Sequence, residues 1–190
     1  MNFRTHSRRP RLRPHGFTLV ELLVVMAIAA ILAGVAVPSM RDLVKSMRLT
    51  SATNDLFGSL MLARSEAVKR NDRVVLCKST DGTSCAQAGG WEQGWLVFHD
   101  ANNNGQREGA EEIVQRAQAL SSELRLGGNI YVAKYISYTP DGVSKLISGA
   151  FQSGTITLCN ASSRPGPARQ IVLSPAGRPR VQKTTAASCA

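Results

Sequence analysis

The chain has 190 residues, 43% of them hydrophobic, and a formal net charge of +10. This length fits one anchored domain and excludes two large ones. Five arginines and no acid lie within the first 16 residues, so the remainder has 18 basic and 13 acidic residues, a net charge of +5. Half of the positive charge therefore belongs to a short N-terminal segment, of the kind that stays in the cytoplasm beside a membrane span.

A long apolar run follows this basic segment. Residues 17–37 are apolar except for Thr18 and Glu21. At about 1.5 Å per residue, a helix of this length spans roughly 30 Å, the thickness of the hydrocarbon core of a bilayer. A charge at mid-membrane costs up to about 2.5–3.5 kcal/mol, so we expect Glu21 to meet a partner in an assembly. Residues 17–40 are predicted to form a transmembrane helix.

We expect Pro38 to kink this helix rather than end it, because apolar residues recur at helical spacing beyond it. The pattern predicts an amphipathic continuation over residues 41–70, whose apolar stripe covers the sheet of the same domain. The stripe consists of Leu43, Met47, Leu56, Leu60, Ala63 and Ala67, with Phe57 and Met61 beside it.

From Arg73 onward the sequence changes to short β-rich runs, separated by turn signals such as Pro140-Asp141-Gly142. This change predicts an α+β domain over residues 71–190, with one antiparallel set of strands packed against one helix. The piece from Ser163 to Ala168 contains two prolines and a glycine and is predicted to be a flexible loop. The predicted strands are residues 73–78, 94–99, 112–117, 129–139, 154–160, 169–174 and 178–183.

Four cysteines form an even set in a domain that the anchor delivers to the outside of the membrane, where disulfides persist. Three pairings are possible. Proximity favours Cys77 with Cys85, which closes a short loop, and Cys159 with Cys189, which holds a polar tail. A zinc site is the alternative, but the sequence contains no C-x-x-C pair.

Residues 100–111 fit a calcium-loop pattern, with Asp100, Asn102, Asn104 and Glu111 as candidate ligands. Such a loop needs a helix on each side, whereas the residues before it read as a strand, and Asn-Gly is a strong hairpin signal. We therefore prefer a plain hairpin turn and keep the calcium site as the alternative.

Enzymatic motifs are not found in the sequence. His99 is the only histidine after residue 16, and no nucleophile elbow, phosphate loop or paired-histidine motif accompanies it. We expect no catalytic residue and no cofactor, with His99 either solvated or capping a turn. Trp91 and Trp95 are expected to pack in the core or against a loop.

The segment Gly16-Phe17-Thr18-Leu19-Val20-Glu21, after a basic leader, resembles the processing signal of type IV pilins and type II secretion pseudopilins. The resemblance implies that residues 1–16 are a prepilin leader, and that an inner-membrane prepilin peptidase cuts between Gly16 and Phe17 and methylates the Phe17 amine. It also implies that Glu21 neutralises such an amine, its own or a neighbour's, during filament assembly with other pilins or pseudopilins. An ordinary single-pass anchor with a tolerated acid is the alternative.

Residues 91–105 are similar to the core signature of the FimT/GspH branch of minor pilins. Together with the anchor, residues 158–160 and residues 173–180, this resemblance covers nearly the whole chain after residue 16. It implies a type IV pilin-like α+β fold, in which a long N-terminal helix packs on an antiparallel β-sheet domain. It further implies a single-pass inner-membrane protein with a periplasmic domain, assembled into a pilus or pseudopilus.

The end of the chain is strongly basic. Residues 17–142 have a net charge of −1, whereas residues 143–190 contain six basic residues and no acid. Within that segment, Gly177-Arg178-Pro179-Arg180 resembles the G-R-x-R element of FimT-type pilins linked to DNA uptake in naturally competent bacteria. The resemblance implies phosphate contacts with extracellular DNA that carry no base readout. The candidate DNA-binding residues are Arg164, Arg169, Arg178, Arg180 and Lys183.

Two alternatives to DNA binding remain. The basic residues can be a solvated edge that discourages strand pairing. The chain can also be a minor pseudopilin of a type II secretion machine, in which the same fold makes protein contacts that prime or cap the pseudopilus.

Overall fold

The computed structural model describes residues 16–162 and 164–189, and residues 1–15 of the expected leader lie outside that range. The chain divides into two compact units between Asp42 and Leu43, and we describe each by itself. Within the described residues the elements are α1 (Leu19–Arg70), β1 (Val74–Lys78), the 3-10 helix η1 (Trp91–Gln93), β2 (Trp95–His99), β3 (Ile113–Ala117), β4 (Leu124–Gly128), β5 (Tyr135–Tyr138), β6 (Gly154–Asn160), β7 (Gly166–Leu173) and β8 (Pro179–Ala186).

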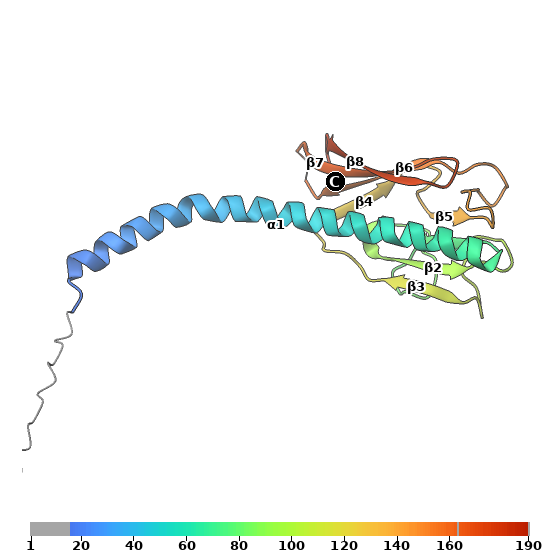
Figure 1. The fold of residues 1–190 in the computed structure, drawn as a ribbon, viewed down its shortest axis with the longest axis horizontal. Coiled ribbons are helices and arrows are strands. Elements are labelled where there is room, and N and C mark those ends of the chain that lie inside the picture. The colour runs from blue at the N-terminus through green and yellow to red at the C-terminus, as the bar shows by residue number, and fades with distance from the viewer. Residues whose placement is uncertain (1–15, 163, 190) are drawn as a thin grey trace, which may run out of the picture. The chain divides into compact units, whose positions relative to one another are not determined.

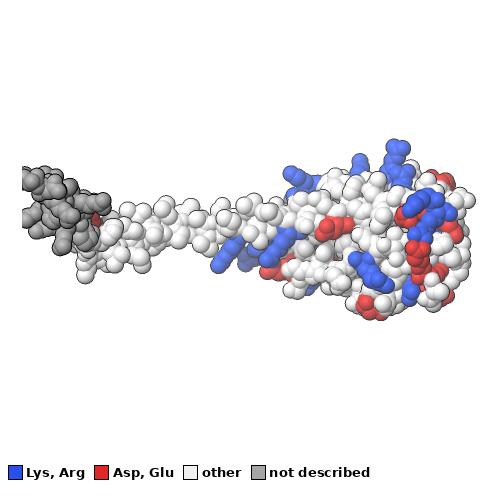
Figure 2. Space-filling view, turned by 60° about the horizontal axis from the view of Figure 1, so that its bottom comes forward, with Lys and Arg blue, Asp and Glu red and all other residues white. Residues whose placement is uncertain are grey.

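The first unit contains the apolar part of α1. This helix is long and apolar enough to cross a membrane, and Pro38 lies inside it, as predicted. All described residues of this unit are exposed. In the space-filling view this part of α1 is uncharged over most of its length (Figure 2). An exposed surface of this composition requires a lipid or protein environment.

The second unit contains two four-stranded antiparallel sheets, where the sequence predicted a single set of strands. The first sheet has the strand order β3-β2-β1-β5, and the second has the order β4-β6-β7-β8. In Figure 1 the second sheet, with β6, β7 and β8, lies on one side of the C-terminal half of α1, and β2 and β3 lie on the other. The helix is thus an element against which both sheets pack.

One hydrophobic core joins α1 and the facing sides of both sheets. Trp91 and Trp95 lie fully inside it, which confirms the expectation that both tryptophans pack in the core. The helix contributes Leu49, Leu56, Leu60, Ala63 and Ala67, the first sheet contributes Val74, Leu76, Val97, Ile136 and Tyr138, and the second sheet contributes Leu124, Leu126, Ile156, Leu158, Ile171 and Leu173.

The predicted apolar stripe of the helix is only partly correct. Leu43, Met47 and Met61 are exposed, while Leu49 and Ala52 are buried. One stripe of the exposed surface of α1, from residue 47 to residue 68, carries uncharged residues three and four positions apart. This charge-free stripe consists of Met47, Ser51, Asn54, Gly58, Met61, Ser65 and Val68.

The strand predictions are correct for β1, β2, β3 and β6 and wrong in the middle of the domain. β4 was missed, and residues 129–134, predicted as strand, form a turn that leads from β4 in the second sheet to β5 in the first. The N–H of Val132 donates to the carbonyl of Asn129, which closes this turn. A Cβ atom at Gly128 would lie 2.3 Å from the carbonyl oxygen of Val132, so the chain can reverse here only at a glycine.

The predicted flexible loop is also partly wrong. Ser163 lies outside the described residues, but Gly166, Pro167 and Ala168 are the first residues of β7 and pair with β8. Pro167 is tolerated because β6 pairs with β7 only from Ala168 onward, so the proline has no ladder partner on that side.

Candidate nucleic-acid interface

The G-R-x-R segment contains the last two residues of the turn that joins β7 to β8 and the first two residues of β8. Gly177 has a φ of +72°, which favours glycine, and its N–H donates to the carbonyl of Ser174. The Nε atom of Arg64 donates to the carbonyl of Gly142 (2.8 Å), so α1 holds the neighbouring turn of residues 139–143 beneath the hairpin. The glycine of this segment is therefore explained by the turn, and Arg178 is left exposed beside it.

The five basic candidates do not form one cluster, because strand register puts them on different faces. Residues paired across an antiparallel sheet point to the same side. Arg169 pairs with Lys183 on one side and with Leu158, a core residue, on the other, so both lie on the side of the sheet that faces the core. Arg180 is three residues from Lys183 in β8 and points to the opposite, outer side.

Arg178, Arg180, Lys183 and Arg164 are exposed, whereas Arg169 is only partly exposed. None of the ion pairs found among the described residues involves these five side chains. Residues 124–190 contain eight basic residues and one acid, Asp141, which lies 3.8 Å from Lys145. The positive charge of this half of the domain is thus free to attract an anion.

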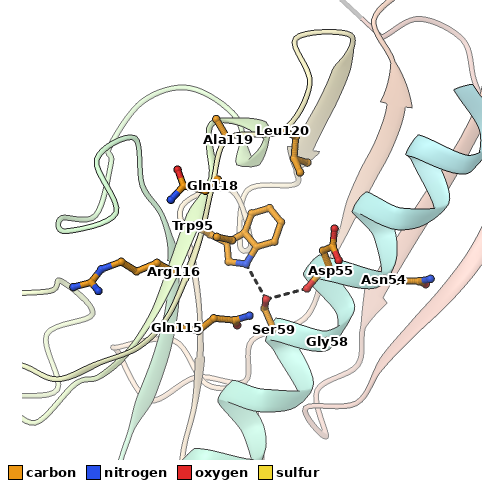
Figure 3. Close-up of a pocket in the computed structure, with 11 residues that line it drawn as sticks. Asn54, Asp55, Gly58, Ser59, Trp95, Gln115, Arg116, Gln118, Ala119 and Leu120 are labelled. Atoms are coloured by element: carbon orange, nitrogen blue, oxygen red, sulfur yellow. Dashed lines mark hydrogen bonds between the residues drawn. The ribbon is translucent and has the colours of Figure 1, made fainter. Parts of the chain in front are cut away.

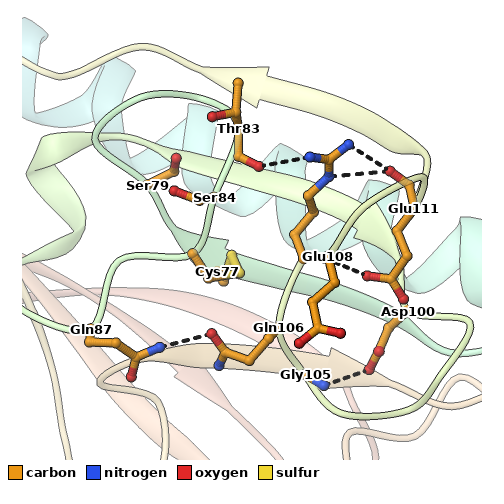
Figure 4. The surroundings of a disulfide bond; sticks show 12 residues. Cys77, Ser79, Thr83, Ser84, Gln87, Asp100, Gly105, Gln106, Glu108 and Glu111 are labelled. Carbon is orange, nitrogen blue, oxygen red and sulfur yellow. Dashed lines mark hydrogen bonds between the residues drawn. A yellow bond between two sulfur atoms is a disulfide. The ribbon is translucent and has the colours of Figure 1, made fainter.

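Both expected disulfides are present. Cys77 is joined to Cys85 with Cα atoms 5.6 Å apart, and Cys159 is joined to Cys189 with Cα atoms 6.0 Å apart. The first bridge packs on the outer face of the first sheet, the face turned away from the main core, beside the loop that follows β2 (Figure 4). The second bridge holds the end of the chain against the outer face of the second sheet, where Ser162 and Cys189 exchange two backbone hydrogen bonds.

The calcium-loop candidates are engaged in a turn. The buried carboxylate of Asp100 accepts the N–H groups of Asn104 and Gly105, both at 3.0 Å. Figure 4 shows the bond from Gly105. Burial raises the pKa of Asp100 in spite of these bonds. The carboxylate of Glu111 accepts the N–H of Glu108, and its negative charge also raises the pKa of Asp100. Across residues 16–162 and 164–189, no three His, Cys, Asp or Glu side chains are arranged to hold a metal ion. The geometry therefore supports the hairpin turn that joins β2 and β3.

The remaining polar candidates have structural partners. His99 Nε2 lies 2.8 Å from a carboxylate oxygen of Asp72, at the turn between α1 and β1. A groove of about 500 Å³ lies between α1 and the end of β3 (Figure 3). At its floor the indole of Trp95 donates to the hydroxyl of Ser59 (2.9 Å), which donates to the backbone carbonyl of Asp55. Asp55 and Arg116 are the only charged residues lining this groove.

Glu21 belongs to a capping box that sequence analysis did not detect, although the T-x-x-E pattern was its signal. The N–H of Thr18 donates to the carboxylate of Glu21 (2.9 Å), and the N–H of Glu21 donates to the hydroxyl of Thr18 (3.2 Å). The Glu21 carboxylate is therefore directed at the backbone next to Phe17. If the chain were cut before Phe17, the new amine would lie one residue before the Thr18 N–H that donates to this carboxylate.

Known proteins match both parts of the chain. The family model described as type II transport protein GspH matches residues 52–177. The chain belongs to the GspH family. A prokaryotic N-terminal methylation motif also matches residues 11–37 of this GspH-family chain.

Sequence similarity places this GspH-family protein among the pilin-like proteins, and a solved structure shares its fold. The pilin-like protein PilA1 of Thermus thermophilus is 31% identical over 176 residues, which is 88% of this chain and 97% of the relative. The type IV minor pilin FimU of Pseudomonas aeruginosa shares the fold with a TM-score of 0.57 and 20% identity, over 77% of this chain and 98% of that one. The predicted fold class, one long helix packed on antiparallel sheets, is confirmed. Proteins of this kind are structural filament subunits and have no enzymatic activity.

Proposed function

We propose that this protein is a minor type IV pilin that binds extracellular DNA without sequence preference, for uptake in natural transformation. The observation that carries the proposal is the charge of residues 124–190, where eight basic residues accompany one acid. Arginine forks match phosphate oxygens in two-bond geometry, and phosphate contacts read no sequence. Arg178 and Arg180 are the main contacts, because both are exposed at the start of the hairpin's second strand.

The test compares two double variants that remove the same charge from different faces of the second sheet. Mature protein in neutral detergent is titrated with duplex DNA over a range of salt concentrations. Arg178→Ala with Arg180→Ala should remove most of the binding and make the slope of log affinity against log salt shallower by about 2. Arg169→Ala with Lys183→Ala, the matched control, should have a smaller effect. Equal effects of the two variants, or no binding by the unaltered protein, would refute the proposal.

We also propose that the mature protein begins at Phe17, after prepilin peptidase removes residues 1–16 and methylates the new amine. The match to the methylation motif and the position of the Glu21 carboxylate support this processing. The protein would then be held in the inner membrane by α1, with its domain in the periplasm. Intact mass measurement of membrane-extracted protein should give a chain that starts at methylated Phe17. A retained leader, or cleavage at another bond, would contradict this proposal.

The second candidate function is that of a minor pseudopilin in type II secretion, which the description of the matching family favours. Deletion of the gene separates the two functions. Loss of DNA uptake with normal protein secretion supports the pilin, and the reverse result supports the pseudopilin.

A further inference from the structure

Apolar side chains are exposed in the basic half of the domain. Among the described residues that follow α1, the large hydrophobic side chains that are exposed are Ile130 (84%), Tyr131 (55%), Phe151 (66%) and Val181 (43%). All four lie within residues 124–190, where Asp141 is the sole acid. We call Ile130, Tyr131 and Phe151 the aromatic patch. Exposed aromatic groups beside basic residues need an explanation, since packing of the core does not use them.

Gln152 fixes the parts of this patch to one another. Its side chain is fully buried, and its Nε2 atom donates to the carbonyls of Tyr131 (2.7 Å) and Tyr135 (2.9 Å). Its Oε1 atom accepts the N–H of Ser137 at 2.9 Å. The turn that carries Ile130 and Tyr131 is therefore held beside the residue that follows Phe151. The two aromatic residues are presented from a rigid support rather than from a loose loop.

Hydrogen bonds also connect Gln152 to the hairpin formed by β7 and β8. The buried hydroxyl of Ser144 lies 2.6 Å from the carbonyl of Gln152 and 3.3 Å from the carbonyl of Ser174. The hydroxyl of Ser174 in turn lies 3.3 Å from the N–H of Arg178 and 3.2 Å from its carbonyl. A chain of short contacts thus joins the aromatic patch to Arg178.

We propose that the aromatic patch stacks unpaired bases, so that the DNA this protein holds best is single-stranded. The inference rests on the proposed DNA binding and names the form of DNA. Basic side chains that follow the phosphates, with aromatic rings on which bases stack, are the two components of sequence-tolerant sites for single strands. The surrounding positive charge makes the patch complementary to a polyanion and not to an uncharged apolar surface. In duplex DNA the faces of the bases are stacked on one another, so the protein can bind a duplex only through contacts between the arginines and the phosphates.

The test uses the full mature chain in neutral detergent with labelled oligo-dT of about 12 nucleotides and a duplex of the same length. Oligo-dT should bind about tenfold more tightly than the duplex. Tyr131→Ala with Phe151→Ala should lower its affinity roughly 10- to 100-fold, as expected for the loss of one or two stacked bases. The same variant should bind the duplex within about twofold of the unaltered protein, with the same salt slope, because it removes no charge.

Two controls separate stacking from a general loss of structure. Tyr131→Phe with Phe151→Tyr keeps both rings and should retain the preference for oligo-dT. Val181→Ala shortens an exposed apolar side chain outside the patch and should change neither affinity. Unchanged melting temperatures show that the variants are folded.

The possible outcomes distinguish this inference from the proposed function. If neither DNA binds, the proposed function is wrong and the inference is wrong with it. If the duplex binds as tightly as oligo-dT and the aromatic variant alters neither, DNA binding stands and the stacking inference is overturned. The patch would then be a contact for a protein partner.

Discussion

The α-carbon of Gly177 packs directly against the carbonyl oxygen of Gly142. A Cβ atom at residue 177 would lie 2.3 Å from that oxygen and 3.0 Å from the backbone nitrogen of Ser144. The hairpin that carries Arg178 and Arg180 is therefore seated on the turn of residues 139–143, and Arg64 of α1 holds that turn from below. The glycine of the G-R-x-R segment positions the arginines without contacting any ligand.

Gly177→Ala should destabilise the domain by more than about 1 kcal/mol, because it combines an unfavourable positive φ with a steric clash. Gly149→Ala is the matched control, since Gly149 has a φ of +88° but no atom within 4 Å of a Cβ atom. Urea denaturation of both variants measures the difference. Equal losses would show that the clash with the turn has no energetic effect.

Asp100→Ala should cost about 1–3 kcal/mol, because it leaves the N–H of Gly105 without its acceptor and the N–H of Asn104 with only the side-chain oxygen of Asn102. Asp100→Asn keeps one acceptor oxygen and should cost less. Adding millimolar calcium should leave the melting temperature of the unaltered protein unchanged, since the carboxylate is already used inside the turn. A rise in melting temperature that Asp100→Ala abolishes would instead establish the calcium site.

The two disulfides should differ in their contribution to stability, because they close loops of 8 and 30 residues. Chain-entropy estimates give about 2.5 kcal/mol for Cys77–Cys85 and about 3.6 kcal/mol for Cys159–Cys189. Paired Cys→Ser variants measured by thermal denaturation should follow this order. A larger loss from the shorter loop would show that packing around Cys77, a core residue, outweighs chain entropy.

The pair of Asp72 and His99 should affect the acid side of the stability profile. The hydrogen bond from His99 lowers the pKa of Asp72 below its ordinary value of 3.8. A carboxyl group with a lowered folded-state pKa stabilises the protein above the unfolded-state pKa, and the contribution is lost as pH falls through the lower folded-state value. Asp72→Asn should therefore make stability fall less steeply below about pH 4. His99→Gln should flatten the same region, and a profile unchanged by either variant would contradict the assignment.

Local patterns were sufficient to predict most of the elements. The helical spacing of apolar residues in α1 and the short β-rich runs of β1, β2 and β6 between turn signals indicate the conformation of these elements. β4 was missed because Gly127-Gly128 reads as a break between elements, whereas both glycines pair with β6. The division into two sheets could not be predicted, since periodicity identifies a strand and not the neighbour with which it pairs.

Strand pairing, which periodicity does not reveal, also limited the prediction of the candidate interface. The basic residues were identified from sequence as one candidate set, and the sequence analysis did not foresee that Arg180 and Lys183 lie on opposite faces of β8. Their relation to Arg169 depends on the register between β7 and β8, which only the fold supplies. The aromatic patch was also missed, because Tyr131 and Phe151 are distant in sequence and are linked only in the fold, where Gln152, next to Phe151, donates to the backbone carbonyl of Tyr131.

The order in which the two sheets can be completed follows from the topology. All strands of the first sheet are synthesised by Tyr138, whereas the second sheet needs β8, and the disulfide of the second sheet needs Cys189. While residues 139–189 are still emerging from the ribosome, the helix and first sheet expose the apolar side that the second sheet will later cover. A chain in which residues 139–189 have not yet folded therefore exposes apolar surface of the kind that makes partly folded intermediates prone to aggregation.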